Sequence, residues 1–179
     1  MISLHFAVGS AGEFGLNGKL PWGSIPKELE TFWKGLKSEN PDYIAMGSTT
    51  FNSLPKAVVD RLKEVAVLKI IDLGRGLSPK ENAKMLYDIL TSLDGKVSVI
   101  GGAFILNTIL TCMVELVDKM YISVMHLSMV NPRTLSYEPM KADTYLDMAQ
   151  LNLIFDNLAH RRTIVEVDTE FTSMIMEMQ

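Results

Sequence analysis

The chain has 179 residues, a formal net charge of −4 and one cysteine, which together suit a single domain, residues 1–179, with a sizeable core. A mildly acidic chain offers no broad positive field to a nucleic-acid backbone, and a lone cysteine excludes an intrachain disulfide or a cysteine-ligated zinc cluster. We expect a buried Cys112, a cytoplasmic location and no membrane span, because the sequence shows neither a secretion signal nor a long apolar run.

The first predicted element is a strand over residues 2–8, in which apolar side chains alternate with a less apolar face that carries His5 and Ala7. Residues 9–23 hold five glycines and one proline, which predicts a loop. We then expect Ser24 to cap a helix that ends near residues 35–37. This helix has a proline in its first turn and an apolar stripe made of Leu29, Phe32, Trp33 and Leu36.

The rest of the chain alternates strands with helices. In chain order we expect a strand at 43–47, a short helix from Ser48–Thr50, a strand around Val65–Ile70, a helix from a Ser78 cap to the residues before Asp94, a strand at 96–100 that runs into Gly101–Gly102, a helix from 103, a strand at 119–126 and two strands within 162–178 joined near Asp168. This order predicts an α/β domain with a mostly parallel sheet and a closing antiparallel hairpin.

Two turns that follow strands have the residues of a nucleotide site. Gly101–Gly102 would let the backbone approach a ligand closely, and the helix that follows would offer free N–H groups to a pyrophosphate. The segment MGSTT at 46–50 has the same strand-to-helix form. Neither segment has the G-x-G-x-x-G spacing of the dinucleotide fingerprint, so an ordinary strand-to-helix turn is the alternative interpretation.

Glu28 is the candidate binding carboxylate. It follows a loop that carries Trp22 and is flanked by apolar residues, so it could enter an apolar pocket, where its pKa would rise and where it could bind paired N–H donors. The alternative is a solvated acid in the first turn that stabilises the helix dipole. The three histidines are too scattered along the chain to predict a metal site.

Taken in order, these stretches resemble the dihydrofolate reductase family, and the short LPWG form is similar to that of its phage-encoded members. The matching stretches are ISLHFAVG, FGLNGKLPW, IPKELETF, AMGSTTFNSLP and VIGGAFIL, which cover roughly residues 1–125. The resemblance implies a three-layer fold with helices on both faces of the sheet. It also implies reduction of 7,8-dihydrofolate to tetrahydrofolate, with hydride transfer from nicotinamide C4 to pterin C6 and protonation at N5.

The resemblance also implies roles for individual residues. Glu28 would pair with the 2-amino group and N3–H of the pterin, Trp22 would hold a water near it, Leu20 would close over the nicotinamide, and Ser123 would hydrogen-bond the acid. Arg61 would bind the glutamate tail of the substrate. The remaining substrate-binding positions implied in this way are His5, Ala7, Leu29, Phe32, Leu54 and Ile100.

For the cofactor, the resemblance implies NADPH and a cis peptide bond between Gly101 and Gly102. NADH stays open, because Ser48–Thr49 stand where the family usually has basic residues that hold the cofactor phosphates; Lys69 or Arg75 could supply that charge. The full set of implied cofactor positions is Ala7, Gly15, Leu20, Gly47, Ser48, Thr49, Thr50, Lys69, Gly101, Gly102, Ala103 and Phe104.

Two other interpretations stay open. The fold could serve as a binding or viral structural protein with weak or no turnover, or it could belong to a reductase that acts on a pyrimidine. For the enzyme we expect a small-molecule substrate, no nucleic-acid or membrane partner, no metal, a monomer or homodimer, and the host cytoplasm as its location if it is encoded by a phage.

Overall fold

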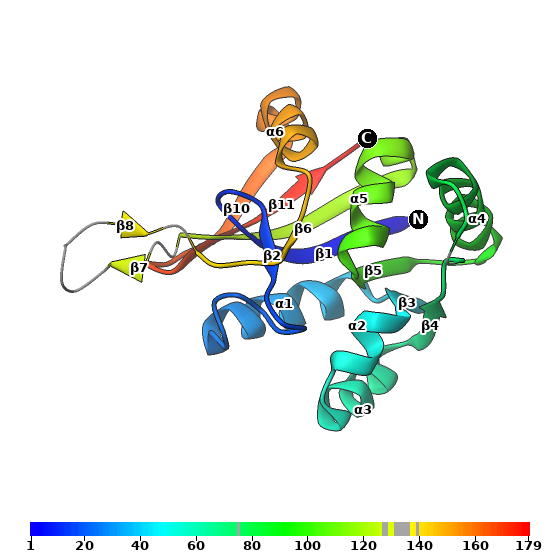
Figure 1. Cartoon of the computed structure of the whole chain (residues 1–179), viewed down its shortest axis with the longest axis horizontal. Coiled ribbons are helices and arrows are strands. Elements are labelled where there is room, and N and C mark those ends of the chain that lie inside the picture. Colours follow the sequence, from blue (N-terminus) through cyan, green and yellow to red (C-terminus); the bar gives the residue numbers. More distant parts are fainter. Residues whose placement is uncertain (75, 127–128, 131–136, 139) are drawn as a thin grey trace.

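A seven-stranded sheet is the centre of the computed structural model, which describes residues 1–74, 76–126, 129–130, 137–138 and 140–179 (Figure 1). The strands from β6 to β4 are parallel, whereas β11 is antiparallel to β6 and to β10. This arrangement confirms the predicted mostly parallel sheet with a closing hairpin. Across the sheet the order is β10 (Arg162–Val167), β11 (Phe171–Glu177), β6 (Val117–Met125), β1 (Ile2–Gly9), β5 (Val97–Gly101), β3 (Tyr43–Gly47) and β4 (Val67–Ile71).

Helices cover both faces of this sheet, as expected for three layers (Figure 1). One face carries α1 (Pro26–Glu39), α2 (Ser48–Ser53) and α3 (Lys56–Val65), and the other carries α4 (Pro79–Ser92), α5 (Ala103–Cys112) and α6 (Met148–Asn157). The smaller elements are β2 (Glu13–Gly15) paired with β9 (Thr144–Tyr145), β7 (Met129–Val130) paired with β8 (Tyr137–Glu138), and the short helical turns η1 (Val114–Leu116) and η2 (Ala159–Arg161). None of the helices in the described ranges combines the length and hydropathy needed to cross a bilayer.

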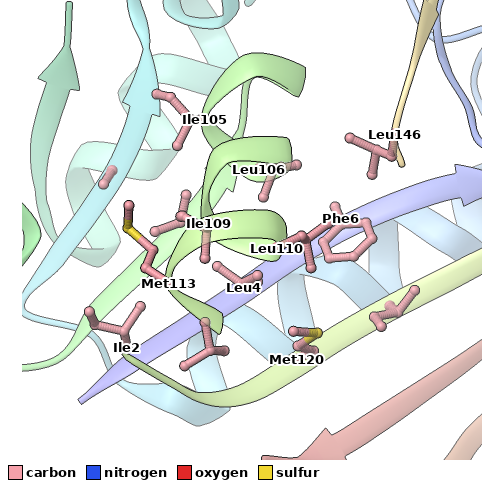
Figure 2. Packing of buried hydrophobic residues seen from close by; sticks show 14 of the residues in the cluster. Ile2, Leu4, Phe6, Ile105, Leu106, Ile109, Leu110, Met113, Met120 and Leu146 are labelled. Atoms are coloured by element: carbon pink, nitrogen blue, oxygen red, sulfur yellow. The ribbon is translucent and has the colours of Figure 1, made fainter. Parts of the chain in front are cut away.

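The larger core lies between α5 and the middle of the sheet. Figure 2 shows the apolar side of α5 resting on Leu4 and Phe6 of β1 and on Met120 of β6. These three sheet residues are at most 4% exposed. The buried residues of α5 recur three and four positions apart, so one helix face packs on the sheet and the opposite face points to solvent.

Local sequence signals explain how two helices begin. α4 starts with the predicted Ser78 cap, which forms a full capping box with Glu81. α1 starts differently from the prediction: its N-cap is Ile25, without a side-chain cap, and Ser24 is exposed outside the helix. The reason is Pro26, which suits the first helical position and holds the residue before it in an extended conformation.

Several other predictions were wrong. Cys112 is exposed rather than buried, because it falls on the outer side of the last turn of α5. α1 continues to Glu39 and ends at Asn40, whose left-handed conformation (φ 48°) closes the helix. The glycine-rich segment is not only a loop, since β2 lies within it. No prediction was made for residues 148–157, which form α6. β4 begins two residues later than expected, because α3 extends to Val65.

Candidate active site

β1 and β5 are neighbouring parallel strands in the middle of the sheet, so their carboxyl ends lie side by side. The chain leaves β1 through α1 toward β3, whereas it leaves β5 through α5 toward β6, on the opposite face. In open α/β sheets, ligands bind where the connections of neighbouring strands diverge in this way. Ala7, near the end of β1, and Gly101–Gly102, at the end of β5, therefore stand where a binding crevice is expected.

Glu28 lies in the first turn of α1 and is only 5% exposed, so it is not a solvated helix-dipole acid. Burial raises the pKa of its carboxyl above the usual range, and an interaction with the Ser123 side chain partly opposes that rise. Ser123 is on β6, directly opposite Ala7 of β1. The structure thus brings together three residues that were predicted from distant parts of the sequence.

Both ends of α1 are fastened to the sheet. At its start, Lys27 Nζ lies 2.9 Å from Asp168 Oδ2 in the β10–β11 turn. At its end, the Tyr121 hydroxyl of β6 donates a 2.7 Å hydrogen bond to Glu39 Oε2. Between them, Gly35 allows close approach, since a Cβ there would lie 2.9 Å from Tyr121 Cδ1. These contacts fix the position of the helix that carries Glu28.

Trp22 is half-buried, and it packs, as Ala7 does, against a cluster that includes Ile25 and Phe171. Its indole Nε1–H is buried without a hydrogen-bond partner among the described residues. Buried N–H groups are normally satisfied, so this donor fits a hydrogen bond to a bound water or ligand.

The predicted apolar walls lie on the α1 side of the sheet. Phe32, Leu54 and Ile100 are half-buried and pack against one cluster, which includes Trp33. Leu29 is more open, at 37% exposed. The guanidinium carbon of Arg61 lies 4.0 Å from the ring centroid of Trp33, a cation–π contact that holds Arg61 next to α1.

His5 lies in the same layer and is 1% exposed. Its ring stacks on Tyr121 with centroids 4.3 Å apart and meets Phe32 edge-on. Nε2 lies 3.0 Å from Ser3 Oγ and 3.2 Å from Ser98 Oγ, while Nδ1 has no hydrogen-bond partner in the part of the chain that the structure describes. Burial lowers the pKa of His5 from 6.5 to about 3, so the ring is neutral over the physiological range.

The paired glycines form a cradle that side chains would fill. A Cβ at Gly101 would lie 3.2 Å from Thr50 Cγ2, and one at Gly102 would lie 3.4 Å from Thr50 Oγ1. Gly102 has φ +80°, which favours glycine. The expected cis bond between them is not present: the peptide is trans, and the turn is made by the positive φ of Gly102 instead. Their backbone groups fit close approach of a cofactor.

The other predicted cofactor residues are only partly gathered. Gly47 lies against Gly102, Ala103 opens α5, and Ser48 and Thr49 open α2. The side chain of Phe104 is 56% exposed. Lys69 is exposed on β4 and lies two residues before Ile71, so both side chains point to the same face of the sheet. Ile71 packs in the core on the α5 side, and Lys69 therefore faces away from α2. Arg75 lies outside the described residues.

The glycine-rich loop rests on a segment near β9. Gly15 contacts Thr144, and the Asn17 N–H donates a 2.7 Å hydrogen bond to Asp143 Oδ2. Leu20 is exposed on this loop.

Two residues of this region were missed. Ser173 of β11 pairs with Ser123 and is equally buried, but only the strand pairing reveals it. Asp72 follows β4 directly and accepts a 3.1 Å hydrogen bond from Ser48 Oγ. A carboxylate immediately after an apolar strand is a signal that the sequence did contain.

Comparison with known proteins shows to which enzyme class and family this chain belongs. A family model described as dihydrofolate reductase matches residues 1–150. A dihydrofolate reductase of Escherichia phage T5 is 32% identical over 166 residues, which cover 88% of this chain and 86% of the relative. Dihydrofolate reductase type A10 of Escherichia coli is 23% identical over 165 residues, covering 90% and 80%. The chain is thus an oxidoreductase. It belongs to the dihydrofolate reductase family, and the predicted resemblance to phage-encoded members is confirmed.

Proposed function

We propose that this chain reduces 7,8-dihydrofolate to tetrahydrofolate with a reduced nicotinamide dinucleotide. The observation that carries the proposal is the buried Glu28 carboxylate, which interacts with Ser123 of β6 directly opposite Ala7 of β1. Family membership alone leaves open whether the site is intact, and this carboxylate supports an intact one.

Glu28 would bind the 2-amino group and N3–H of the pterin through its two oxygens. In an apolar surround, this paired interaction compensates for the loss of water around the carboxylate. Because burial raises its pKa, the group also exchanges a proton more readily near neutral pH than an exposed glutamate does. It would therefore favour protonation of the substrate at N5 through solvent.

The remaining residues would position the reactants. Gly101, Gly102 and Thr50 would hold the dinucleotide, whose nicotinamide supplies the hydride from C4 to pterin C6 when bound. The Trp22 Nε1–H, which has no partner within the described ranges, would hold a water near Glu28, and Phe32 would exclude bulk solvent from the pterin ring. The protein's contribution is thus proximity, a dry pocket and one poised carboxylate.

The test follows the absorbance of reduced nicotinamide after addition of dihydrofolate. Glu28→Ala should lower kcat/KM by at least about 100-fold, the usual size of a lost acid–base group. Glu30→Ala is the matched control, because Glu30 is exposed on the same helix and pairs only with Lys34 among the described residues. It should keep wild-type activity.

If the folded wild-type protein oxidises neither NADPH nor NADH in the presence of dihydrofolate, the proposed enzymatic activity is refuted. Protection against heating by a bound pterin, in the absence of turnover, would then support the binding or structural role. Equal activity of Glu28→Ala and wild type would refute the role of the carboxylate while leaving the reaction in place.

A further inference from the structure

A carboxylate, Asp72, follows the edge strand β4, two strands from the cradle formed by Gly101 and Gly102. β3 and β4 are parallel, with Gly47 opposite Ile71, so the next residues of each strand, Ser48 and Asp72, leave the sheet together. Ser48 Oγ donates a 3.1 Å hydrogen bond to Asp72 Oδ1. Asp72 is exposed, so a ligand in solvent can reach its carboxylate. The hydrogen bond fixes where this charge lies.

The distance from the paired glycines to Asp72 suits the distance from the pyrophosphate to one nucleoside of an extended dinucleotide. The cradle at Gly101–Gly102 follows β5, and β3 and then β4 are the next strands outward. Two strand spacings separate the ends of β5 and β4, about 10 Å. A pyrophosphate at the cradle would lie between the two nucleosides. With the nicotinamide toward Ala7 on β1, the adenosine ribose would extend toward β3 and β4.

An acidic group at this place recognises a free ribose. A carboxylate after a strand accepts hydrogen bonds from the 2′- and 3′-hydroxyls, whereas a basic side chain accommodates a 2′-phosphate. A phosphate monoester carries between one and two negative charges near neutral pH, and it would be repelled by the Asp72 carboxylate.

Among the described residues, which do not include Arg75, no cation offsets this charge. Within the described ranges Asp72 forms no ion pair. Lys69 faces the opposite side of β4, toward the α5 side of the sheet, and Ser48–Thr49 stand at the start of α2 without a positive charge.

We propose that Asp72, held by Ser48, selects the unphosphorylated adenosine ribose, so that this reductase uses NADH in preference to NADPH. The use of NADH in catalysis rests on the proposed function, whereas the preference for the unphosphorylated ribose rests on the placement of Asp72. It departs from the general use of NADPH by the family, and it gives Asp72 a role as a specificity-determining residue.

Two measurements test it on the whole chain. The first is kcat/KM for NADH and for NADPH in dihydrofolate reduction; the second is the dissociation constant of ADP-ribose and of its 2′-phosphate by titration calorimetry. We expect wild type to favour the ligand without the phosphate in both. Asp72→Asn should shift each ratio toward the phosphorylated ligand by about 10-fold or more, equal to at least about 1.4 kcal/mol. Asp156→Asn, which removes an exposed acid on α6, should leave both ratios unchanged.

A wild-type preference for the 2′-phosphate, from whatever residue it arises, would overturn the proposal. Ratios that are unchanged in a folded Asp72→Asn protein would overturn it as well. If neither cofactor supports turnover but the calorimetric ratio still shifts in Asp72→Asn, the proposed function fails while the specificity of the ribose site stands.

Discussion

Acidification should destabilise this protein through His5, which burial keeps neutral in the folded state. Its pKa falls from 6.5 to about 3 on folding, because an imidazolium in this layer would lose its hydrating water in exchange for two serine hydroxyls and the rings of Tyr121 and Phe32. Between these two values the unfolded chain binds a proton that the folded chain does not. His5 therefore does not lower the free energy of unfolding above pH 6.5, and it lowers it progressively as the pH drops toward 3.

The size of the effect follows from the same shift. At about pH 5, some 1.5 pH units below the unfolded value, one titrating group removes about 2 kcal/mol of stability, since each unit corresponds to about 1.4 kcal/mol. That is a substantial part of the roughly 5–15 kcal/mol that a domain of this kind has. Carboxylates with ordinary pKa values titrate at lower pH, and Glu28, whose pKa burial raises, is present both in wild type and in a variant that lacks His5. The difference between these two proteins in the loss between about pH 7.5 and about pH 5 therefore reports on His5.

Urea unfolding of wild type and His5→Leu at about pH 7.5 and about pH 5 measures this contribution. The variant should lose about 2 kcal/mol less than wild type between the two conditions, whatever its absolute stability. His160→Leu, which replaces an exposed histidine, serves as the control and should retain the wild-type loss. An equal loss in wild type and His5→Leu would refute the argument that burial suppresses protonation of His5.

Three further changes have expected outcomes. Because burial raises the pKa of Glu28, its ionisation lowers the free energy of unfolding as the pH rises above 4.5. Glu28→Gln should therefore raise Tm at about pH 7.5, and raise it less at about pH 4.5. An unchanged Tm at both pH values would contradict this. Gly35→Ala places a Cβ 2.9 Å from Tyr121 and should cost about 1–3 kcal/mol in urea unfolding, whereas a cost below about 0.5 kcal/mol would mean that α1 moves freely. Arg61→Ala removes the guanidinium above Trp33 and should cost about 0.5–1 kcal/mol. It should also raise KM for dihydrofolate but not for a pterin without the glutamate tail, and equal effects on both substrates would exclude contact with the tail.

Local chemistry was enough to predict the elements whose determinants are neighbours in sequence. The Ser78–Glu81 capping box, the alternation of β1 and the turn near Asp168 each depend on residues within a few positions of one another. The apolar residues that flank Glu28 made its carboxylate a candidate for burial, but a solvated acid in the first turn stayed open as the alternative, and the packing of α1 on the sheet decided between them.

Tertiary structure alone decided the contacts between strands and helices that are far apart in the chain. Tyr121 reaches Glu39 across 82 residues, and Ser173 faces Ser123 only because β11 pairs with β6 in one register. The exposure of Cys112 likewise depended on which face of α5 met the sheet. Sequence periodicity fixes which residues share a face, but strand order and register determine what that face meets, and these are set by packing over the whole chain.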